Sequence, residues 1–233
     1  MASSVPKTPR RLRIGVMMDE VQLSDIMGID IFGNLSQEYM AKVQVFEPKW
    51  GAIEHHAAPM EFFYIATTLE PANLTPDGLR FVPNVTYDDC PRDLDIVIVG
   101  GPLWTHRPAQ ADRFMKEAWL KTRVWLTTCI GSMWLASSGV LGGLKCTTNR
   151  EGLEAAKKMH PEVEWLDQRW VVEEKPFDGE GKGELWTAGG AGAGINMIAT
   201  YCLENFDKDF VNTLALRPLE FRLDGNMSQF YLA

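Results

Sequence analysis

The chain has 233 residues, of which 45% are hydrophobic, so it is long enough to bury the core of one α/β domain. Its 23 Lys and Arg against 31 Asp and Glu give a net charge of -8 without a basic cluster, which argues against nucleic-acid binding. No stretch resembles a membrane span or a signal peptide, so we expect a cytoplasmic protein without membrane contact. We further expect a flexible segment over residues 1–10 and a single domain over residues 11–233.

The first half of the chain alternates apolar runs with helical patterns. Apolar and β-branched runs predict strands over 12–18, 61–66 and 94–99, and a weaker hairpin or edge strand over 78–87. A helix is expected over about 25–35. Residues 36–59 follow no clear pattern, and we interpret them as an insertion or a loop that faces a dimer partner.

The second half continues this alternation. Helices are predicted over 108–120, 131–140, 151–159 and 192–205, and extended segments over 124–127, 144–148, 165–174 and 184–188. Strands that alternate with helices of about ten to fifteen residues are typical of βαβ units. The sequence therefore predicts one doubly wound α/β domain, with a mainly parallel sheet and helices on both faces.

Open α/β sheets bind ligands beyond the carboxyl ends of their strands. The residues directly after the predicted strands are therefore the candidates for chemistry. They are Asp19, Glu20, Asp25, Gly100, Gly101, Cys129 and the Gly-rich residues 189–192, which include Gly190.

Cys129 lies between a predicted strand and a predicted helix, and Gly131 removes the side chain that would crowd so sharp a turn. A thiol at a helix N-terminus faces backbone N–H groups and the helix dipole, which predicts a lowered pKa. The alternative is a small buried core cysteine, the commoner state of a free thiol.

Asp25 follows the first strand, close to the start of the first helix. An acid there commonly serves as a helix cap or first-turn residue. A carboxyl that faces a thiol in a closed pocket instead shuttles a proton, provided that burial raises its pKa. Glu20 is the rival candidate for that role.

Several residues after the 94–99 strand could line a pocket. Gly100 and Gly101 either mark a tight turn or let backbone N–H groups face a developing oxyanion. Trp104 flanks the same region, and Trp134 flanks Cys129. His106 lies on this loop and could approach the pocket, although a surface histidine is the simpler interpretation.

No cofactor and no metal are expected. The glycines of residues 187–194 come late in the chain without a downstream acid in a second βαβ unit, so they are not a dinucleotide fingerprint. The histidines and cysteines lack metal-ligand spacing. Cys146 and Cys202 are interpreted as core thiols, and Cys90 lies in a predicted turn.

Four segments together resemble the ThiJ/PfpI superfamily, whose members share the class I glutamine-amidotransferase-like, flavodoxin-like fold. These segments are Asp25-Ile-Met-Gly28, Asp95-Ile-Val-Ile-Val-Gly-Gly101, Thr128-Cys-Ile-Gly-Ser-Met-Trp-Leu-Ala-Ser-Ser-Gly-Val-Leu-Gly-Gly143, and Arg169-Trp-Val-Val with Glu184-Leu-Trp-Thr-Ala-Gly-Gly-Ala-Gly-Ala-Gly-Ile-Asn-Met197. Two departures stand out. Asn196 replaces the family's common Asp, and Lys145-Cys-Thr-Thr-Asn-Arg150 lacks the His that many hydratase-like members place after their Thr pair.

The resemblance implies a role for each matched residue. Cys129 matches the nucleophile, Asp25 matches the acid that faces it, and Gly101 with Ile130 matches the backbone oxyanion donors. An Asp at the acidic position and Ile130 after the cysteine look more like the isocyanide hydratase branch and related fungal-type homologues than the protease, deglycase or glyoxalase-like branches. Family members are usually dimers, so a homodimer is expected.

The resulting hypothesis is an enzyme in which Cys129 adds to an electrophilic carbon of a small-molecule substrate while Asp25 moves the protons. An isocyanide hydratase-like reaction is the most concrete form, and a hydrolase or lyase that tailors a secondary metabolite fits the same residues. Two alternatives come from other classes: a redox-sensing or stress-response protein that oxidises Cys129, and a binding module with an unreactive, buried cysteine.

Overall fold

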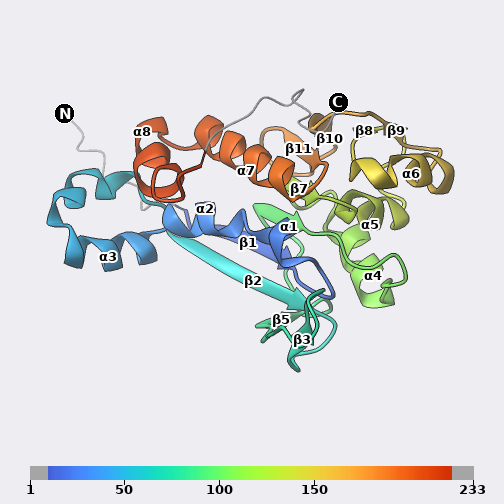
Figure 1. Cartoon of the computed structure of the whole chain (residues 1–233), viewed down its shortest axis with the longest axis horizontal. Helices are drawn as coiled ribbons and strands as arrows, with labels where there is room; N and C mark the ends of the chain where they lie inside the picture. The colour runs from blue at the N-terminus through green and yellow to red at the C-terminus, as the bar shows by residue number, and fades with distance from the viewer. Residues whose placement is uncertain (1–9, 222–233) are drawn as a thin grey trace.

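The computed structural model describes residues 10–221, and a seven-stranded sheet runs through its centre (Figure 1). The strand order is β10-β11-β7-β6-β1-β2-β5. Every neighbouring pair in this sheet is parallel except β10 with β11. The segment expected to be flexible, residues 1–10, lies outside the described residues except for Arg10.

The central strands are short apolar runs that are buried on both faces, as parallel strands between helix layers must be. The strands of the sheet are β1 (Leu12–Met17), β2 (Met60–Ala66), β5 (Val85–Thr86), β6 (Ile96–Val99), β7 (Val124–Thr128), β10 (Trp170–Lys175) and β11 (Gly183–Ala188). Two small pairs lie outside it: β3 (Ala72–Asn73) with β4 (Arg80–Phe81), and β8 (Lys145–Cys146) with β9 (Glu164–Trp165).

Helices cover both faces of the sheet, which confirms the predicted fold class. One group packs together and consists of α1 (Leu23–Ile26), α2 (Ile29–Asn34), α7 (Ala191–Asn205), α8 (Lys208–Val211) and the π-helical turn η3 (Asn212–Leu216). The other contains α4 (Ala109–Ala118) and α5 (Gly131–Ser137). The 3-10 turn η2 (Arg150–Gly152) and α6 (Leu153–Met159) follow β8. None of the helices in residues 10–221 is long and apolar enough to cross a bilayer.

Four predicted elements are each divided in the structure. The hairpin or edge strand expected over 78–87 is β4 and β5, which pair in different sheets, and the helix expected over 151–159 begins as η2 and continues as α6. The helix expected over 25–35 is two short helices, α1 and α2, with the poor helix former Gly28 between them. The strand expected over 165–174 is divided into β9 and β10, because its two ends pair with different partners, β8 and β11. The turns α8 and η3 were not predicted.

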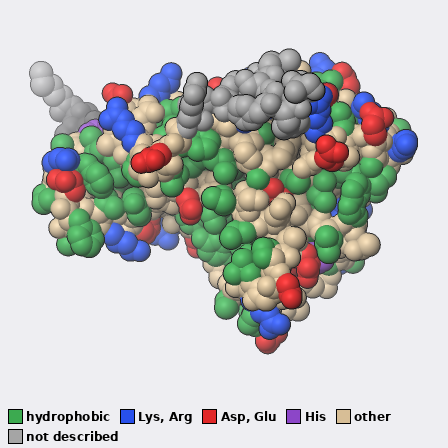
Figure 2. Space-filling view, in the orientation of Figure 1, with side chains coloured by type: hydrophobic (Ala, Val, Ile, Leu, Met, Phe, Trp, Pro, Cys, Tyr) green, Lys and Arg blue, Asp and Glu red, His purple; other side chains and the backbone are tan. Residues whose placement is uncertain are grey.

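Residues 36–59 form a helical arm rather than an irregular loop. They contain α3 (Gln37–Phe46) and the 3-10 helix η1 (Pro48–His56), which extend beyond one end of the sheet (Figure 1). Apolar side chains are visible on the outer part of this arm in Figure 2, and Val45 and Phe46 are 76% and 87% exposed. The dimer-facing interpretation of the arm stays a prediction.

Candidate active site

Cys129 occupies a sharp elbow between β7 and α5. Its φ of +60° is in the left-handed region, which costs a non-glycine residue about 1–2 kcal/mol. Neighbouring segments hold this conformation: the Cys129 N–H donates to the carbonyl of Ala188 at 3.1 Å, and Thr148 Oγ1 donates to the Cys129 carbonyl at 3.0 Å. The surrounding chain thus enforces a strained backbone that aims the thiol at the carboxyl edge of the sheet.

Gly131 allows this elbow because nothing larger fits beneath the first turn of α5. A methyl group there would lie 2.5 Å from the carbonyl oxygen of Val99 and 2.7 Å from that of Gly100. Both contacts are to backbone atoms of β6 and the turn after it, which cannot move without displacing the sheet.

We therefore expect Gly131→Ala to destabilise the protein by about 2 kcal/mol or more, measured as the free energy of unfolding in urea. Gly33→Ala is the matched control, because Gly33 lies in α2 with no atom within 4 Å of the added methyl group. That variant should be neutral or slightly stabilising. Equal losses in both variants would show that the elbow is not closely packed.

Asp25 faces Cys129 from α1 and is only 2% exposed. Its Oδ2 accepts a hydrogen bond from the Gly101 N–H at 3.0 Å. Its Oδ1 is buried and has no hydrogen-bond partner within the described part of the chain. The Cys129 thiol lies close enough to affect the pKa of the Asp25 carboxyl group. Burial raises the pKa of Asp25 to about 6, while the Gly101 N–H and the thiol oppose that rise.

The thiol of Cys129 does not have the low pKa that its helix N-terminus predicts. Burial and the negative charge of Asp25 raise the pKa of Cys129 to about 11, and hydrogen bonds from Asn149 and from the Ile130 N–H only partly oppose this. The side chain is 9% exposed. Burial and the Asp25 charge thus outweigh these two donors, because the thiol is almost enclosed. At neutral pH the resting pair is a thiol beside a carboxylate.

Asn149 is a site residue that our sequence analysis did not select. Its Nδ2 lies 3.4 Å from Cys129 Sγ, and its Oδ1 accepts a hydrogen bond from the Glu151 N–H at 3.0 Å. Asn149 caps the turn η2, which follows β8. The sequence feature that could have identified Asn149 is its position directly after Thr147 and Thr148, where the resemblance leads one to expect His.

The backbone N–H groups of Gly101 and Ile130, which are the two proposed oxyanion donors, have different partners. The Gly101 N–H is already bonded to Asp25 Oδ2, so in this state it orients the carboxylate instead of facing a substrate. The Ile130 N–H points toward the Cys129 thiol. The role of Ile130 as an oxyanion donor stays a prediction.

The other predicted pocket residues differ in their access to the site. Gly190 is the N-cap of α7 and lines a cavity of about 130 Å³ together with Thr148. Gly100 lies under α1, where an added methyl group would meet Ile26 and Asp25 at 3.0–3.3 Å. Trp104 is 46% exposed on the loop after β6.

Trp134 cannot line an open pocket, because it is fully buried. It instead supports His106, whose ring contacts it edge-on with 5.7 Å between centroids. His106 Nε2 lies 3.8 Å from the buried carboxylate of Asp19, and that carboxylate accepts hydrogen bonds from Thr67. His106 is thus partly buried near the end of β1 rather than exposed on the surface.

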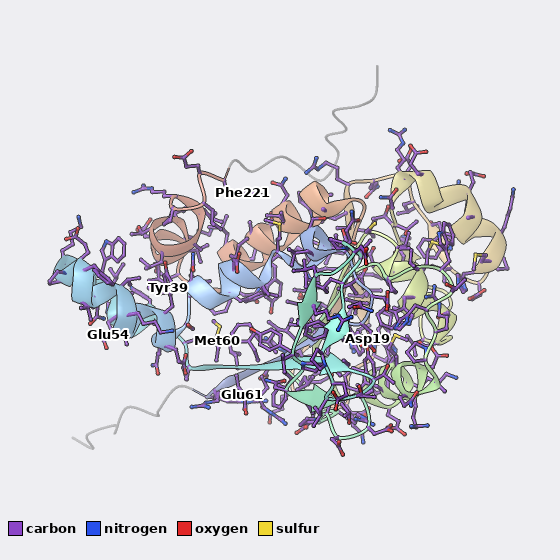
Figure 3. All side chains as sticks on the ribbon, turned by 60° about the horizontal axis from the view of Figure 1, so that its bottom comes forward. Asp19, Tyr39, Glu54, Met60, Glu61 and Phe221 are labelled. Atoms are coloured by element: carbon purple, nitrogen blue, oxygen red, sulfur yellow. The ribbon has the colours of Figure 1, made fainter. Side chains whose placement is uncertain are left out.

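Glu20 has a φ of +57°, and its backbone bonds to Asn73 and Thr75, on the side of β3. These bonds favour Asp25 over Glu20 as the acid of the site. Figure 3 shows the neighbouring Asp19 far from Tyr39 and Glu54, which lie on the arm. Residues 36–59 therefore do not close over this edge of the sheet.

The remaining cysteines are buried and reduced: Cys90, Cys146 and Cys202. Burial raises the pKa of each of these thiols. Residues 10–221 contain no group of three or more His, Cys, Asp or Glu side chains arranged to hold a metal ion.

This fold and site define an α/β domain that carries a cysteine on a strand-to-helix elbow, facing a buried acid. The chain belongs to the DJ-1/PfpI family, whose sequence model matches residues 35–201. The match confirms the ThiJ/PfpI resemblance at the level of the superfamily. No curated protein matches the sequence.

Solved structures agree with the fold. A THiJ/PfpI family protein from Pseudomonas syringae is 19% identical with a TM-score of 0.70, covering 98% of this chain and 84% of the other. Schizosaccharomyces pombe DJ-1 is 16% identical with a TM-score of 0.58, covering 91% and 100%. An AraC family transcriptional regulator from Pseudomonas putida is 12% identical with a TM-score of 0.62, covering 88% and 97%. At these identities the likeness concerns the fold.

Proposed function

We propose that the protein is a cysteine-dependent enzyme that adds the Cys129 thiolate to an electrophilic carbon of a small metabolite. The observation that carries this proposal is the buried Asp25 carboxyl. Its Oδ2 accepts the Gly101 N–H, and its Oδ1 has no hydrogen-bond partner among the described residues. The carboxyl group lies close enough to the Cys129 thiol for the thiol to affect its pKa. An enclosed carboxylate with a pKa near 6 is a base suited to neutral pH.

The most concrete reaction is hydration of an N-substituted isocyanide to the N-substituted formamide. The thiol proton moves to Asp25 as Sγ forms a bond to the terminal carbon, and Asp25 returns that proton to the same carbon, which leaves a thioimidate. Water then adds to this carbon and gives one proton to Asp25. Asp25 passes that proton to the nitrogen, the C–S bond breaks, and the proton of the added hydroxyl group returns through Asp25 to the Cys129 sulfur. The N-substituted formamide leaves with the elements of one water, which restores the thiol and the carboxylate. A hydrolase or lyase of another electrophilic metabolite would use the same two residues.

A redox sensor is less well supported. Sensor cysteines are exposed thiols of low pKa, whereas Cys129 is nearly buried and its pKa is raised to about 11. The burial agrees better with a binding module that has an unreactive cysteine. That alternative gives no reason for a buried acid beside the thiol, since an uncompensated buried carboxylate costs stability.

We expect isocyanide turnover to rise with pH through about 6, because Asp25 must lose its own proton before it can accept one from Cys129. Iodoacetamide should label Cys129 slowly at pH 7 to 9, with a rate that climbs steadily across this range, because the thiol stays protonated below about 11.

The measurement is kcat/KM for a panel of small isocyanides from pH 4.5 to 9, with labelling rates on the same samples. Cys129 labelling that levels off below pH 8 would contradict the raised thiol pKa. A complete lack of turnover across the panel would exclude the isocyanide reaction and leave the other electrophiles to be tested.

A further inference from the structure

A thiolate formed at Cys129 needs a hydrogen-bond donor, because it would carry its charge in a nearly closed site. The helix N-terminus supplies the Ile130 N–H. The other nearby backbone donor, the Gly101 N–H, is bonded to Asp25. Within residues 10–221, the Ile130 N–H is thus the backbone donor that acts on the sulfur, and no second backbone N–H joins it there.

We propose that the side-chain amide of Asn149 is this second donor and stabilises the Cys129 thiolate during the reaction. The inference rests on the proposed role of Cys129 as the nucleophile. Asn149 Nδ2 lies 3.4 Å from Sγ, within hydrogen-bond reach of a sulfur acceptor. It contacts the reacting atom itself, so it belongs to the catalytic residues.

The orientation of the Asn149 amide is fixed by a second bond. Its Oδ1 accepts the Glu151 N–H at 3.0 Å as the cap of η2. Reversing the amide would place its NH2 group against that N–H and its oxygen against the sulfur, losing both interactions. The cap thus aims Nδ2 at the thiol before any substrate binds, which is the preorganisation that electrostatic stabilisation requires.

Among the side chains of residues 10–221, Asp25 and Asn149 act on the Cys129 sulfur, and of these two Asp25 alone is a base. An amide donates a hydrogen bond without accepting a proton, whereas an imidazole in its place would compete for the thiol proton. In the proposed step the S–H bond breaks, its proton moves to Asp25, and the electron pair stays on Sγ facing Nδ2–H. No other group changes its protonation.

The test compares two variants that keep the cap. Asn149→Ser and Asn149→Asp both retain an oxygen for the Glu151 N–H, since Ser and Asp are good caps. Ser removes the donor to Sγ, and Asp also adds a negative charge beside it. Ser36→Ala is a remote control, because it removes the cap of α3, where Ser36 Oγ accepts the Tyr39 N–H.

At pH 8 the iodoacetamide rate of Cys129 is proportional to its thiolate fraction. We expect this rate to fall about tenfold in Asn149→Ser, the equivalent of one hydrogen bond to a charged group, and further in Asn149→Asp. Ser36→Ala should label like the wild type. Unchanged labelling in both Asn149 variants, with only a change in unfolding midpoint, would overturn the inference and leave Asn149 as a cap.

Turnover separates this inference from the proposed function. If the labelling rate falls as expected but no isocyanide is converted by the wild type, Asn149 still stabilises the thiolate and only the reaction is wrong. If the wild type does convert an isocyanide, kcat should fall in both variants at a similar KM. An unchanged kcat in Asn149→Ser would overturn the role of Asn149 while the proposed function stands.

Discussion

Cys129→Ala is expected to lower kcat for any substrate of this protein by about 10⁴-fold or more, because it removes the atom that forms the covalent bond. The fold should tolerate the change. Alanine pays a similar cost for the left-handed φ of +60°, and only one sulfur atom is lost from the elbow. We therefore expect an unfolding free energy within about 1 kcal/mol of the wild type.

Cys146→Ala is the matched control for this experiment. Cys146 is also a buried thiol, and burial raises its pKa to about 12, yet it lies in β8 outside the site. The control should keep its turnover and the wild-type rate of iodoacetamide labelling at Cys129. Turnover that survives in Cys129→Ala would end the covalent mechanism, and the binding module would then be the better hypothesis.

Asp25→Asn is expected to act in opposite directions on turnover and on thiol reactivity. Without a base, kcat should fall by about 10²- to 10⁴-fold. Removing the carboxylate also removes a charge that raises the pKa of Cys129, so iodoacetamide should label the variant faster than the wild type at pH 8. Faster labelling together with lost turnover would show that Asp25 transfers a proton. A residue that only supports the thiol would not produce this combination.

The same substitution should stabilise the fold above pH 6. The folded-state pKa of Asp25 is raised from 3.8 to about 6, so its contribution to stability is present at low pH and lost as pH rises through about 6. Two pKa units correspond to about 3 kcal/mol, which is an upper limit for the gain. Asparagine has no charge to bury and keeps an oxygen for the Gly101 N–H.

Urea unfolding at pH 4 and pH 8 tests this expectation. Wild type and Asp25→Asn should have similar unfolding free energies at pH 4, and the variant should be the more stable at pH 8. A variant that is less stable at both values would indicate that Asp25 supports the fold through its bond to the Gly101 N–H and that its buried charge costs nothing. Such an outcome would also weaken the case for a raised pKa.

Much of the fold was predictable because central parallel strands are continuous apolar runs. β6 and β7 match their predicted ranges closely, and α7 matches to within one residue. Predictions failed where partners decide the structure. β9 and β10 are separate because they pair in different sheets, and the arm of residues 36–59 has a weak periodicity that gave no clear helical pattern.

The sequence by itself determined the elbow, since an apolar strand, Cys129 and the small Gly131 leave few other conformations. Its place after the first strand made Asp25 a candidate beside Glu20, and the family resemblance then matched it to the acid that faces the cysteine. Only the tertiary structure placed Asn149 beside the sulfur and showed the Gly101 N–H bonded to Asp25, 76 residues away in the chain. It also reversed the expected thiol pKa, because the ionisation of Cys129 depends on burial and on a charge from another element, neither of which local sequence contains.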